Sequence, residues 1–418
     1  MISSLKGTQD ILPPESGFWK YIENICRNIY AKYGYEEIRT PIIEPKALFE
    51  RGVGKDTDIV QKQMYAFTDQ GGRDICLRPE QTASVVRAYI EHDLSKTQQF
   101  VKLFYFGPMY RSERPQAGRQ REFYQTGVEI LGTYSPYADC EIIILLEDIL
   151  KQLFLSDYKL KLNSLGCSKD KEKFKKQLKG ILKPQIKKLC QDCQDRYSTN
   201  ILRILDCKNE VCKNNLRMLN IDNSHLCEEC AAHFNKVKGI LNAENISFEF
   251  DPFLVRGLDY YTKTVFEVIA QGLGAQSAVA AGGRYDNLVS DLGGQETGSC
   301  GFAIGFERLI SIIDKEKLKY SAPCAVLFIV AMNEASYKEA FALQNKLRKK
   351  GISCDMDYQA RSLKAQMRYA DKKNAKFVAV IGDDELKTQE VNLKNMKTGE
   401  QQKVNLNQLA DFLNNFKL

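Results

Sequence analysis

The segment FYFGPMYRSERPQAGRQREFYQTGVEILG at residues 104–132 decides the fold. Strand-like runs at 101–110 and 122–131 enclose a charged loop that contains glycine and proline. Two such runs around a polar loop predict an antiparallel hairpin. We therefore expect an antiparallel sheet built around this segment.

The second run of the hairpin alternates in side-chain character. One face carries Phe123, Gln125, Gly127 and Glu129, and the other carries Tyr124, Val128 and Ile130. Alternate residues of a strand point to opposite sides of a sheet, so the second face is expected in the core. A carboxylate and an amide on the first face are costly to bury without a polar ligand. This face is predicted to line a ligand site, and the alternative is an ordinary solvated sheet face.

The loop of the hairpin is rich in arginine. Four arginines and one glutamate surround the turn, namely Arg111, Glu113, Arg114, Arg119 and Arg121. The planar guanidinium group donates two parallel hydrogen bonds, a geometry that suits phosphate oxygens. The loop is therefore predicted to bind phosphate, the alternative being arginines that are simply solvated.

The composition of the 418 residues narrows the class of protein. Hydrophobic residues make up 44% and charged residues 27%, which indicates a globular chain of two or three domains. With only three histidines, a three-histidine zinc site or a Ser-His-Asp triad is not expected. No membrane contact is expected, because the sequence has neither a bilayer-spanning apolar run nor a signal peptide. An odd number of cysteines, 13, suits the reducing cytoplasm.

The net charge of +7 is unevenly distributed, because lysines gather between residues 159 and 188. Contact with a polyanion would be local, and a solvated lysine-rich helix face explains the pattern equally well.

Two glycine patterns do not carry phosphate chemistry. RGVGKDT at 51–57 has Phe49 where a P-loop needs its first glycine. GLGAQS at 272–277 lacks the third glycine of a dinucleotide site, so we interpret it as the turn of a hairpin between 265–270 and 278–281.

The composition and pattern of the sequence change twice along the chain. A Lys- and Cys-rich stretch at about 168–245 interrupts the first domain, which we place at 1–322. At 323–418 apolar strand-like runs alternate with helical ones, which predicts a separate small α/β domain.

Several of these segments resemble class II aminoacyl-tRNA synthetases. Residues 104–132 resemble motif 2 of that family, and GFAIGFERL at 301–309 resembles motif 3. LVRGLDYYTKTVFE at 254–267 and AAGGRYDNL at 280–288 are similar to the signature peptides of the histidyl-tRNA synthetase branch. Further matches are YEEIRTPIIEP at 35–45, similar to the dimer-forming motif 1, LRPEQT at 77–82 and KGTQDILPPE at 6–15.

The resemblance implies an α+β fold, with an antiparallel sheet flanked by helices, a helical insertion and a C-terminal anticodon-binding domain whose sheet is five-stranded and mixed. It implies a homodimer that uses ATP with Mg²⁺ to activate L-histidine and transfers it to the 3′ end of tRNA(His). The alternative is an inactive, synthetase-like regulatory subunit of histidine biosynthesis. A synthetase-like module attached to a kinase is disfavoured, because no kinase motif is present.

The resemblance also assigns residues to the two substrates. Arg111 would hold the α-phosphate of ATP with Arg256 opposite, and Arg308 the γ-phosphate. Glu113 would accept from the adenine amino group, with Phe123 stacked on the base. Fixed cations aimed at the developing phosphate charge are the main requirement of this chemistry.

The expected histidine pocket combines polar and aromatic side chains. Its members are Glu80, Thr82, Gln125, Glu129, Arg256, Tyr260, Tyr261 and Tyr285. Glu129 and Tyr261 would hold the imidazole, while Glu80, Thr82 and Gln125 would meet the α-ammonium group. The tyrosines have packing as their alternative role.

Some positions remain open. Gln81 and Gln120 depart from the residues common in the family, which leaves the contacts of the 113–121 loop undecided. For anticodon recognition, residues 361–369 and the lysines after them are candidates.

Paired cysteines in the insertion predict a structural zinc site. Cys190 and Cys193 have the C-x-x-C spacing, as do Cys227 and Cys230. Other possible ligands nearby are Cys207, Cys212, His225 and His233. The alternative is an insertion without metal, since the family does not require one.

Overall fold

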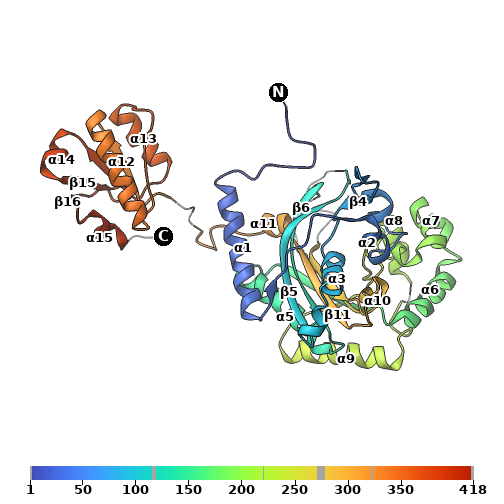
Figure 1. Cartoon of the computed structure of the whole chain (residues 1–418). Helices are drawn as coiled ribbons and strands as arrows, with labels where there is room; N and C mark the ends of the chain where they lie inside the picture. Colours follow the sequence, from blue (N-terminus) through green and yellow to red (C-terminus); the bar gives the residue numbers. More distant parts are fainter. Residues whose placement is uncertain are drawn as a thin grey trace. The chain divides into compact units, whose positions relative to one another are not determined.

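The computed structural model describes residues 2–114, 119–219, 221–270, 278–320, 322 and 324–415. It divides into two compact units, Met1–Tyr320 and Ser321–Leu418 (Figure 1).

The larger unit is built on an eight-stranded sheet in the order β1-β5-β6-β11-β10-β9-β7-β8. The strands are β1 Glu36–Glu37, β5 Val101–Tyr110, β6 Glu122–Leu131, β7 Tyr158–Ser164, β8 Glu249–Phe250, β9 Thr262–Ala270, β10 Ala278–Arg284 and β11 Ser299–Gly305. Neighbours run antiparallel except at the two edges, where β1 is parallel to β5 and β8 to β7. The antiparallel sheet predicted from the sequence is confirmed.

The predicted hairpin forms the second and third strands of this sheet. β5 and β6 pair along their whole length, from Val101 opposite Leu131 to Tyr110 opposite Glu122. β9 and β10 also pair antiparallel, as expected. The turn assigned to GLGAQS lies outside the described residues.

One face of the sheet is covered by long helices. They are α1 Glu15–Lys32, α5 Pro136–Gln152, α9 Glu228–Ala243 and the short α11 Phe306–Ser311. Their apolar side chains share one core with Val128 and Ile130 of β6, as the alternation predicts. The single tryptophan, Trp19 of α1, packs edge-on against Tyr124 and Phe306 in this core.

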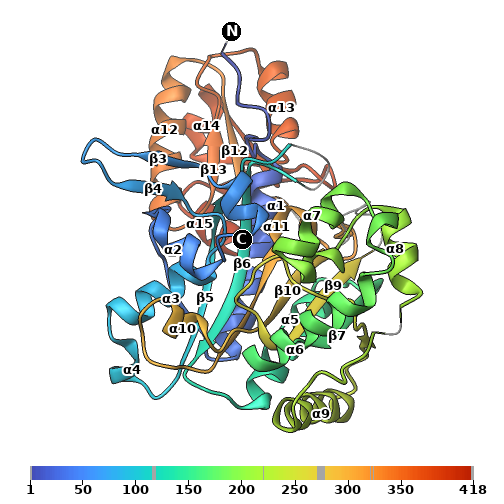
Figure 2. The same cartoon turned by 90° about the vertical axis from the view of Figure 1, so that its right-hand side faces the viewer.

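The other face carries shorter elements. These are α2 Lys46–Gly52, α3 Thr82–Glu91, α4 Leu94–Thr97 and α10 Leu288–Asp291, together with the insertion elements α6 Ser168–Leu182, α7 Gln191–Thr199 and α8 Glu210–Arg217 and the single turns Ile59–Gln63, Ile186–Lys188 and Ile201–Ile204. Figure 2 shows α2, α3 and α10 at one side of the strands and α6–α8 at the other. The middle of this face lies between them.

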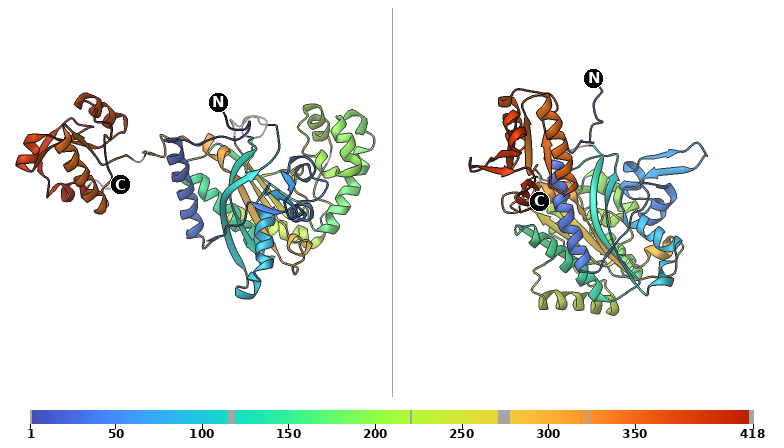
Figure 3. Two further views of the ribbon diagram at one scale, coloured as in Figure 1. Left: turned by 45° about the horizontal axis from the view of Figure 1, so that its top comes forward. Right: turned by 60° about the vertical axis from the view of Figure 1, so that its left-hand side comes forward.

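A small second sheet, in the order β2-β4-β3, extends from the larger unit. Its strands are β2 Ile43–Pro45, β3 Ala66–Thr68 and β4 Asp74–Leu77. Figures 2 and 3 show the β3–β4 hairpin projecting from the body of the unit.

The smaller unit has a five-stranded sheet in the order β13-β12-β14-β15-β16. Its elements are β12 Leu327–Ala331, α12 Glu334–Lys349, β13 Cys354–Met356, α13 Leu363–Lys372, β14 Phe377–Ile381, α14 Asp383–Thr388, β15 Glu390–Asn395, β16 Gln401–Asn405 and α15 Leu409–Asn414. β13, β12 and β14 are parallel, and β15 and β16 are antiparallel additions, so the mixed five-stranded sheet is confirmed. Among the described residues of both units, no helix has the length and apolarity to cross a membrane.

Candidate active site

A cavity of about 1190 Å³ opens on the shorter-helix face of the large sheet. Its floor comes from β6, β9, β10 and β11, and one wall comes from the insertion. The loop before β9, residues 251–261, and the turn Ile59–Gln63 also contribute to the lining. The cavity therefore collects residues from segments far apart in the sequence.

Arg256 enters the cavity from the loop before β9. Its Nη1 donates to Glu267 Oε1 at 2.8 Å, and its guanidinium carbon lies 5.9 Å from the centre of the Tyr261 ring. Burial alone would lower the pKa of Arg256, but the Glu267 carboxylate raises it. The guanidinium is thus held charged, and its Nε has no hydrogen-bond partner among the described residues.

Arg111 enters from the end of β5. Its Nε donates to the carbonyl of Pro79 at 2.9 Å, and its guanidinium carbon lies 5.1 Å from the centre of the Phe123 ring. Burial lowers the pKa of Arg111, and the nearby cations Arg119 and Arg308 act in the same direction. Cations gathered in this way favour an anionic ligand.

Two more residues predicted to bind ATP line the same cavity. Glu113 is oriented by an ion pair with Arg119 at 2.7 Å. Arg308, in the first turn of α11, donates from Nη1 to the carbonyl of Ala278 at 2.9 Å. That bond anchors the Arg308 guanidinium at the start of β10.

Glu129 is fully buried and lies behind Thr82, which lines the cavity. Thr82 Oγ1 donates to its Oε1 at 2.6 Å, and the hydroxyl of Tyr285 donates to its Oε2. Burial raises the pKa of the Glu129 carboxyl to about 8, against the opposing effect of those two hydrogen bonds. Glu129 itself is not among the side chains that line the cavity, whereas Thr82 is.

Polar groups beside Glu129 face the same space. Glu80 accepts from the backbone N–H groups of Thr82 and Ala83 at 2.8 and 2.9 Å, which fixes its carboxylate at the start of α3. Gln125 lines the cavity, and its buried Oε1 has no hydrogen-bond partner within the described part of the chain. A buried amide oxygen without a donor is costly, so the site suits a ligand that donates hydrogen bonds.

The three tyrosines predicted for the histidine pocket form one cluster. The ring centres of Tyr260 and Tyr261 are 4.7 Å apart, and those of Tyr260 and Tyr285 are 5.5 Å apart. Tyr260 and Tyr261 line the cavity, and Tyr285 lies behind Glu129 as its hydrogen-bond donor.

Three residues of the site were missed from the sequence. Tyr105 of β5 lines the cavity, but its neighbours are aromatic on both faces, so no pattern marks it. Glu267 interrupts an apolar strand, a signal that could have identified it. Gly301 pairs with Glu129 across β11 and β6, and a Cβ there would overlap the Glu129 carboxylate. Any residue other than glycine at position 301 would displace the Glu129 carboxylate.

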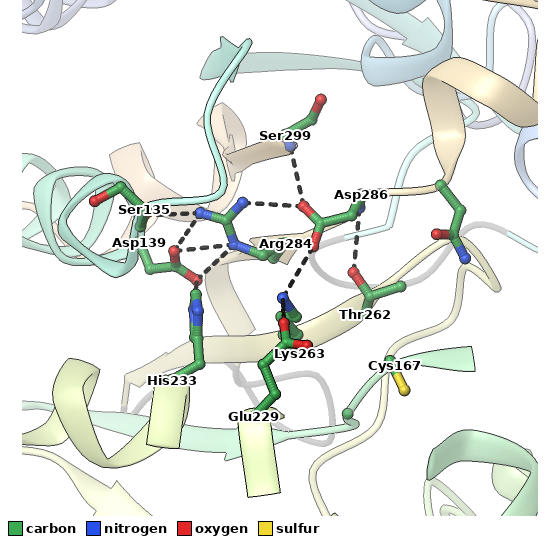
Figure 4. Close-up of polar contacts among 12 residues, drawn as sticks. Ser135, Asp139, Cys167, Glu229, His233, Thr262, Lys263, Arg284, Asp286 and Ser299 are labelled. Carbon is green, nitrogen blue, oxygen red and sulfur yellow. Dashed lines mark hydrogen bonds and ion pairs between the residues drawn. The ribbon is translucent and has the colours of Figure 1, made fainter. Parts of the chain in front are cut away.

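A buried ion network supports the segment that carries Tyr285 (Figure 4). Arg284 is inaccessible to solvent, and its Nε donates to Asp139 Oδ2 at 3.0 Å while its Nη1 donates to Asp286 Oδ1 at 2.9 Å. His233 Nε2 lies 3.4 Å from Asp139 Oδ1. Burial alone would raise the pKa of Asp139, but Arg284 and His233 hold it at about 2.

Asp139→Asn should destabilise the larger unit by about 3 kcal/mol at pH 7, because it leaves Arg284 with a buried charge that Asp286 alone must neutralise. Because its pKa is lowered, the Asp139 carboxyl stabilises the fold fully at pH values above 3.8, its ordinary pKa. It loses that effect as the pH falls toward 2. The difference in the free energy of unfolding between variant and parent should therefore be smaller at pH 3 than at pH 7. Urea unfolding followed by Trp19 fluorescence measures it, because Trp19 lies in this unit.

The matched control is Asp93→Asn, which breaks an exposed ion pair with Lys96 and should leave the midpoint nearly unchanged. Equal midpoints for Asp139→Asn and the parent at pH 7 would contradict the role assigned to the network.

The two C-x-x-C pairs of the insertion, which were predicted to form one site, lie in two separate clusters. Cys190 and Cys193 lie with Cys207 and Cys212, whereas Cys227 and Cys230 lie with Cys167 and Asp170. The correction has a simple cause: each C-x-x-C pair begins a different helix, α7 or α9, and each helix packs with its own neighbours. The histidines join neither cluster, since His225 stacks on Phe174 and His233 contacts Asp139.

Comparison with known proteins gives consistent matches along the chain. Residues 7–309 match the family model described as histidyl-tRNA synthetase, and residues 325–416 match the anticodon binding domain. A histidine-tRNA ligase of Syntrophomonas wolfei is 48% identical over 401 residues, covering 96% of this chain and 95% of the relative. One from Halothermothrix orenii is 46% identical over 415 residues, 98% of each chain. The crystal structure of apo histidyl-tRNA synthetase from Staphylococcus aureus superposes with a TM-score of 0.81 at 38% identity, covering 99% of this chain and 100% of that one.

Proposed function

The chain belongs to the histidyl-tRNA synthetase family, and we propose that the cavity of its larger unit is where L-histidine and ATP react. The protein is a histidine-tRNA ligase: it activates histidine with ATP to histidyl-adenylate and diphosphate, and then transfers histidine to tRNA(His). The observation that carries the assignment of the site is the convergence of Arg111, Arg256 and Arg308 on one cavity beside a buried carboxylate.

The arginines suit the first step of the reaction. Attack of the histidine carboxylate on the α-phosphate of ATP builds negative charge at phosphorus, and fixed guanidinium groups stabilise that charge without reorganising. Arg111 and Arg256 enter from different segments and would hold the α-phosphate from two sides. Arg308 would hold the γ-phosphate. Each is anchored by a contact to the protein, so the positions are set before ATP binds.

Glu113 and Phe123 would bind the adenine. The ion pair with Arg119 orients the Glu113 carboxylate, which would accept from the exocyclic amino group. Phe123 lines the same part of the cavity and offers a ring for stacking on the base.

The other end of the cavity would bind histidine. Gln125 Oε1, which has no partner among the described residues, and the fixed carboxylate of Glu80 offer acceptors for the α-ammonium group, with Thr82 beside them. Glu129 and Tyr261 would hold the imidazole nitrogens. A site that hydrogen-bonds both ends of its substrate rejects amino acids that lack those groups, because its own buried groups stay unpaired.

Magnesium would arrive with ATP, bound largely through phosphate oxygens and water. Several carboxylates line the cavity, Glu267 among them, and such groups are the hard oxygen ligands that this ion prefers, so the residues present fit it. The ion would neutralise part of the phosphate charge.

tRNA(His) would contact both units. The smaller unit, which matches the anticodon binding domain, would bind the anticodon, with α13 and its flanks as candidates. Arg361 in this region forms an ion pair with Asp357 at 3.0 Å and stacks on Tyr369. The Asp357 carboxylate therefore already neutralises part of its charge. The lysines of α6 would add phosphate contacts that weaken with salt.

The active form would be a cytoplasmic homodimer. Motif 1 at 35–45 and β3, a strand of the same small sheet as β2, expose apolar side chains, namely Ile42, Ile43 and Phe67. Such side chains favour burial against a second copy. A fully active monomer in sedimentation experiments would contradict this part of the proposal.

Histidine-dependent exchange of pyrophosphate into ATP tests the assignment directly. The full chain should catalyse the exchange with histidine and with no other standard amino acid, and should charge tRNA(His). A chain that binds histidine without exchange would instead be the inactive regulatory subunit.

A further inference from the structure

Four cysteines of the insertion form a cluster. Cys190, Cys193, Cys207 and Cys212 place their sulfur atoms within 4.8 Å of one another. All four thiols are free, and all but the partly exposed Cys190 are buried. The cluster joins the start of α7, the segment after the turn Ile201–Ile204 and the start of α8.

The spacing of the sulfurs suits a metal ion and not a disulfide. A tetrahedral zinc site with Zn–S bonds of about 2.3 Å places its sulfurs roughly 3.8 Å apart. Cys190 Sγ and Cys207 Sγ are 3.8 Å apart. A disulfide needs about 2.05 Å between its sulfurs.

The surrounding backbone favours thiolates. Cys190 is the N-cap residue of α7, Cys193 lies in the first turn of α7, and Cys212 lies in the first turn of α8. Helix N-termini stabilise negative charge, and the backbone N–H of Cys190 donates to Cys212 Sγ at 3.1 Å. A thiolate site with such support is prepared for a soft divalent cation.

We propose that Cys190, Cys193, Cys207 and Cys212 bind one structural zinc ion. Four thiolates fill the tetrahedral shell and leave no position for a substrate, so the ion would serve structure and not catalysis. Helices as short as α7 and α8 gain stability from such a link.

The zinc would fix one wall of the active site. Cys190 and Cys207 line the cavity, and Arg203, between the cysteine pairs, is bonded to Asp58 at 3.2 Å. Asn200 donates to Asp259 in the loop that carries Arg256. The segment 190–212, linked by the zinc, thus contacts the loop that carries Arg256.

The second cluster has a different explanation. Asp170 there already accepts from the backbone N–H of Cys227 at 2.9 Å and from that of Cys167 at 3.2 Å. The first bond holds the N-cap residue of α9, the second belongs to the capping box of α6, and Cys227 is exposed. This cluster, with Cys230 as a buried member, therefore provides the matched control.

Zinc analysis of the full chain, expressed with zinc and purified without chelator, tests the proposal. The parent should contain one zinc ion per chain, Cys193→Ser should lose it, and Cys230→Ser should keep it. A parent without zinc, or loss of zinc only in Cys230→Ser, would overturn the proposal. Zinc content is independent of ligase activity, so the result does not depend on the assignment of the substrate site.

X-ray absorption at the zinc edge of the parent protein covers the case in which Cys193→Ser does not fold. A first shell of four sulfurs at about 2.3 Å supports the proposed site. A shell of three sulfurs and one oxygen would place the ion at the cluster that includes Asp170 and overturn it.

Discussion

Arg256→Gln should lower the rate of histidyl-adenylate formation roughly 100- to 1,000-fold, because it removes a fixed cation from the charge that develops on the α-phosphate. The effect should appear mainly in kcat, since the charge is greatest in the transition state. Histidine-dependent pyrophosphate exchange measures it. Arg256→Lys keeps the charge but loses the bidentate hydrogen-bond geometry of the guanidinium group. Its rate should lie between those of Arg256→Gln and the parent.

The control for this prediction is Arg73→Gln. It removes one arginine and one ion pair, with Asp69, but at an exposed turn between β3 and β4. Its exchange rate should equal that of the parent. If Arg256→Gln kept the parent's kcat, Arg256 would have no part in the chemistry.

Glu129→Gln is expected to reduce histidine activation by roughly 30- to 1,000-fold, because the substrate imidazole loses its carboxyl partner in a buried site. The loss should appear as a higher KM for histidine, with the KM for ATP little changed. Pyrophosphate exchange at varied histidine concentrations separates the two.

The same substitution should stabilise the fold at alkaline pH. With a pKa of about 8, the Glu129 carboxyl keeps its proton in the folded chain while the unfolded chain releases it above about 4.5. The parent therefore loses stability as the pH rises from about 4.5 to 8, and glutamine, which does not ionise, avoids that loss. The gain at pH 8 should be on the order of a few kcal/mol, measured by urea unfolding.

Glu147→Gln is the matched control for the loss of activity at Glu129. Glu147 is also a buried acid that accepts from a tyrosine hydroxyl, that of Tyr158, but it lies in α5, among the helices on the face of the sheet opposite the cavity. Its exchange activity should be unchanged. Normal histidine dependence in Glu129→Gln would remove Glu129 from the imidazole site.

Local pattern is enough to predict much of this fold. The β5–β6 hairpin follows from two β-rich runs around a polar loop, and the alternation along β6 separates the side chains of the core from those of the site. The α/β class of the smaller unit follows in the same way from its alternating strand-like and helical runs. In each case the signal lies within one short segment.

Contacts between distant segments could not be predicted in this way. Asp139 and Arg284 are separated by 145 positions, and neither stands out from its neighbours in the sequence. The cysteines show the same limit. The C-x-x-C spacing marks Cys190 and Cys193 as one half of a cluster, but the choice of Cys207 and Cys212 as the other half depends on how three short helices pack.

The two faces of β6 also constrain how the gene for this protein can change. Substitutions on either face act separately, since one face meets the core and the other meets the cavity. Loss or gain of a single codon between residues 122 and 131 would instead exchange the faces, turning Glu129 toward the apolar helices and Ile130 toward the substrates. Such an insertion or deletion should therefore abolish folding and activity together, and this strand should accept point mutations but no change in length.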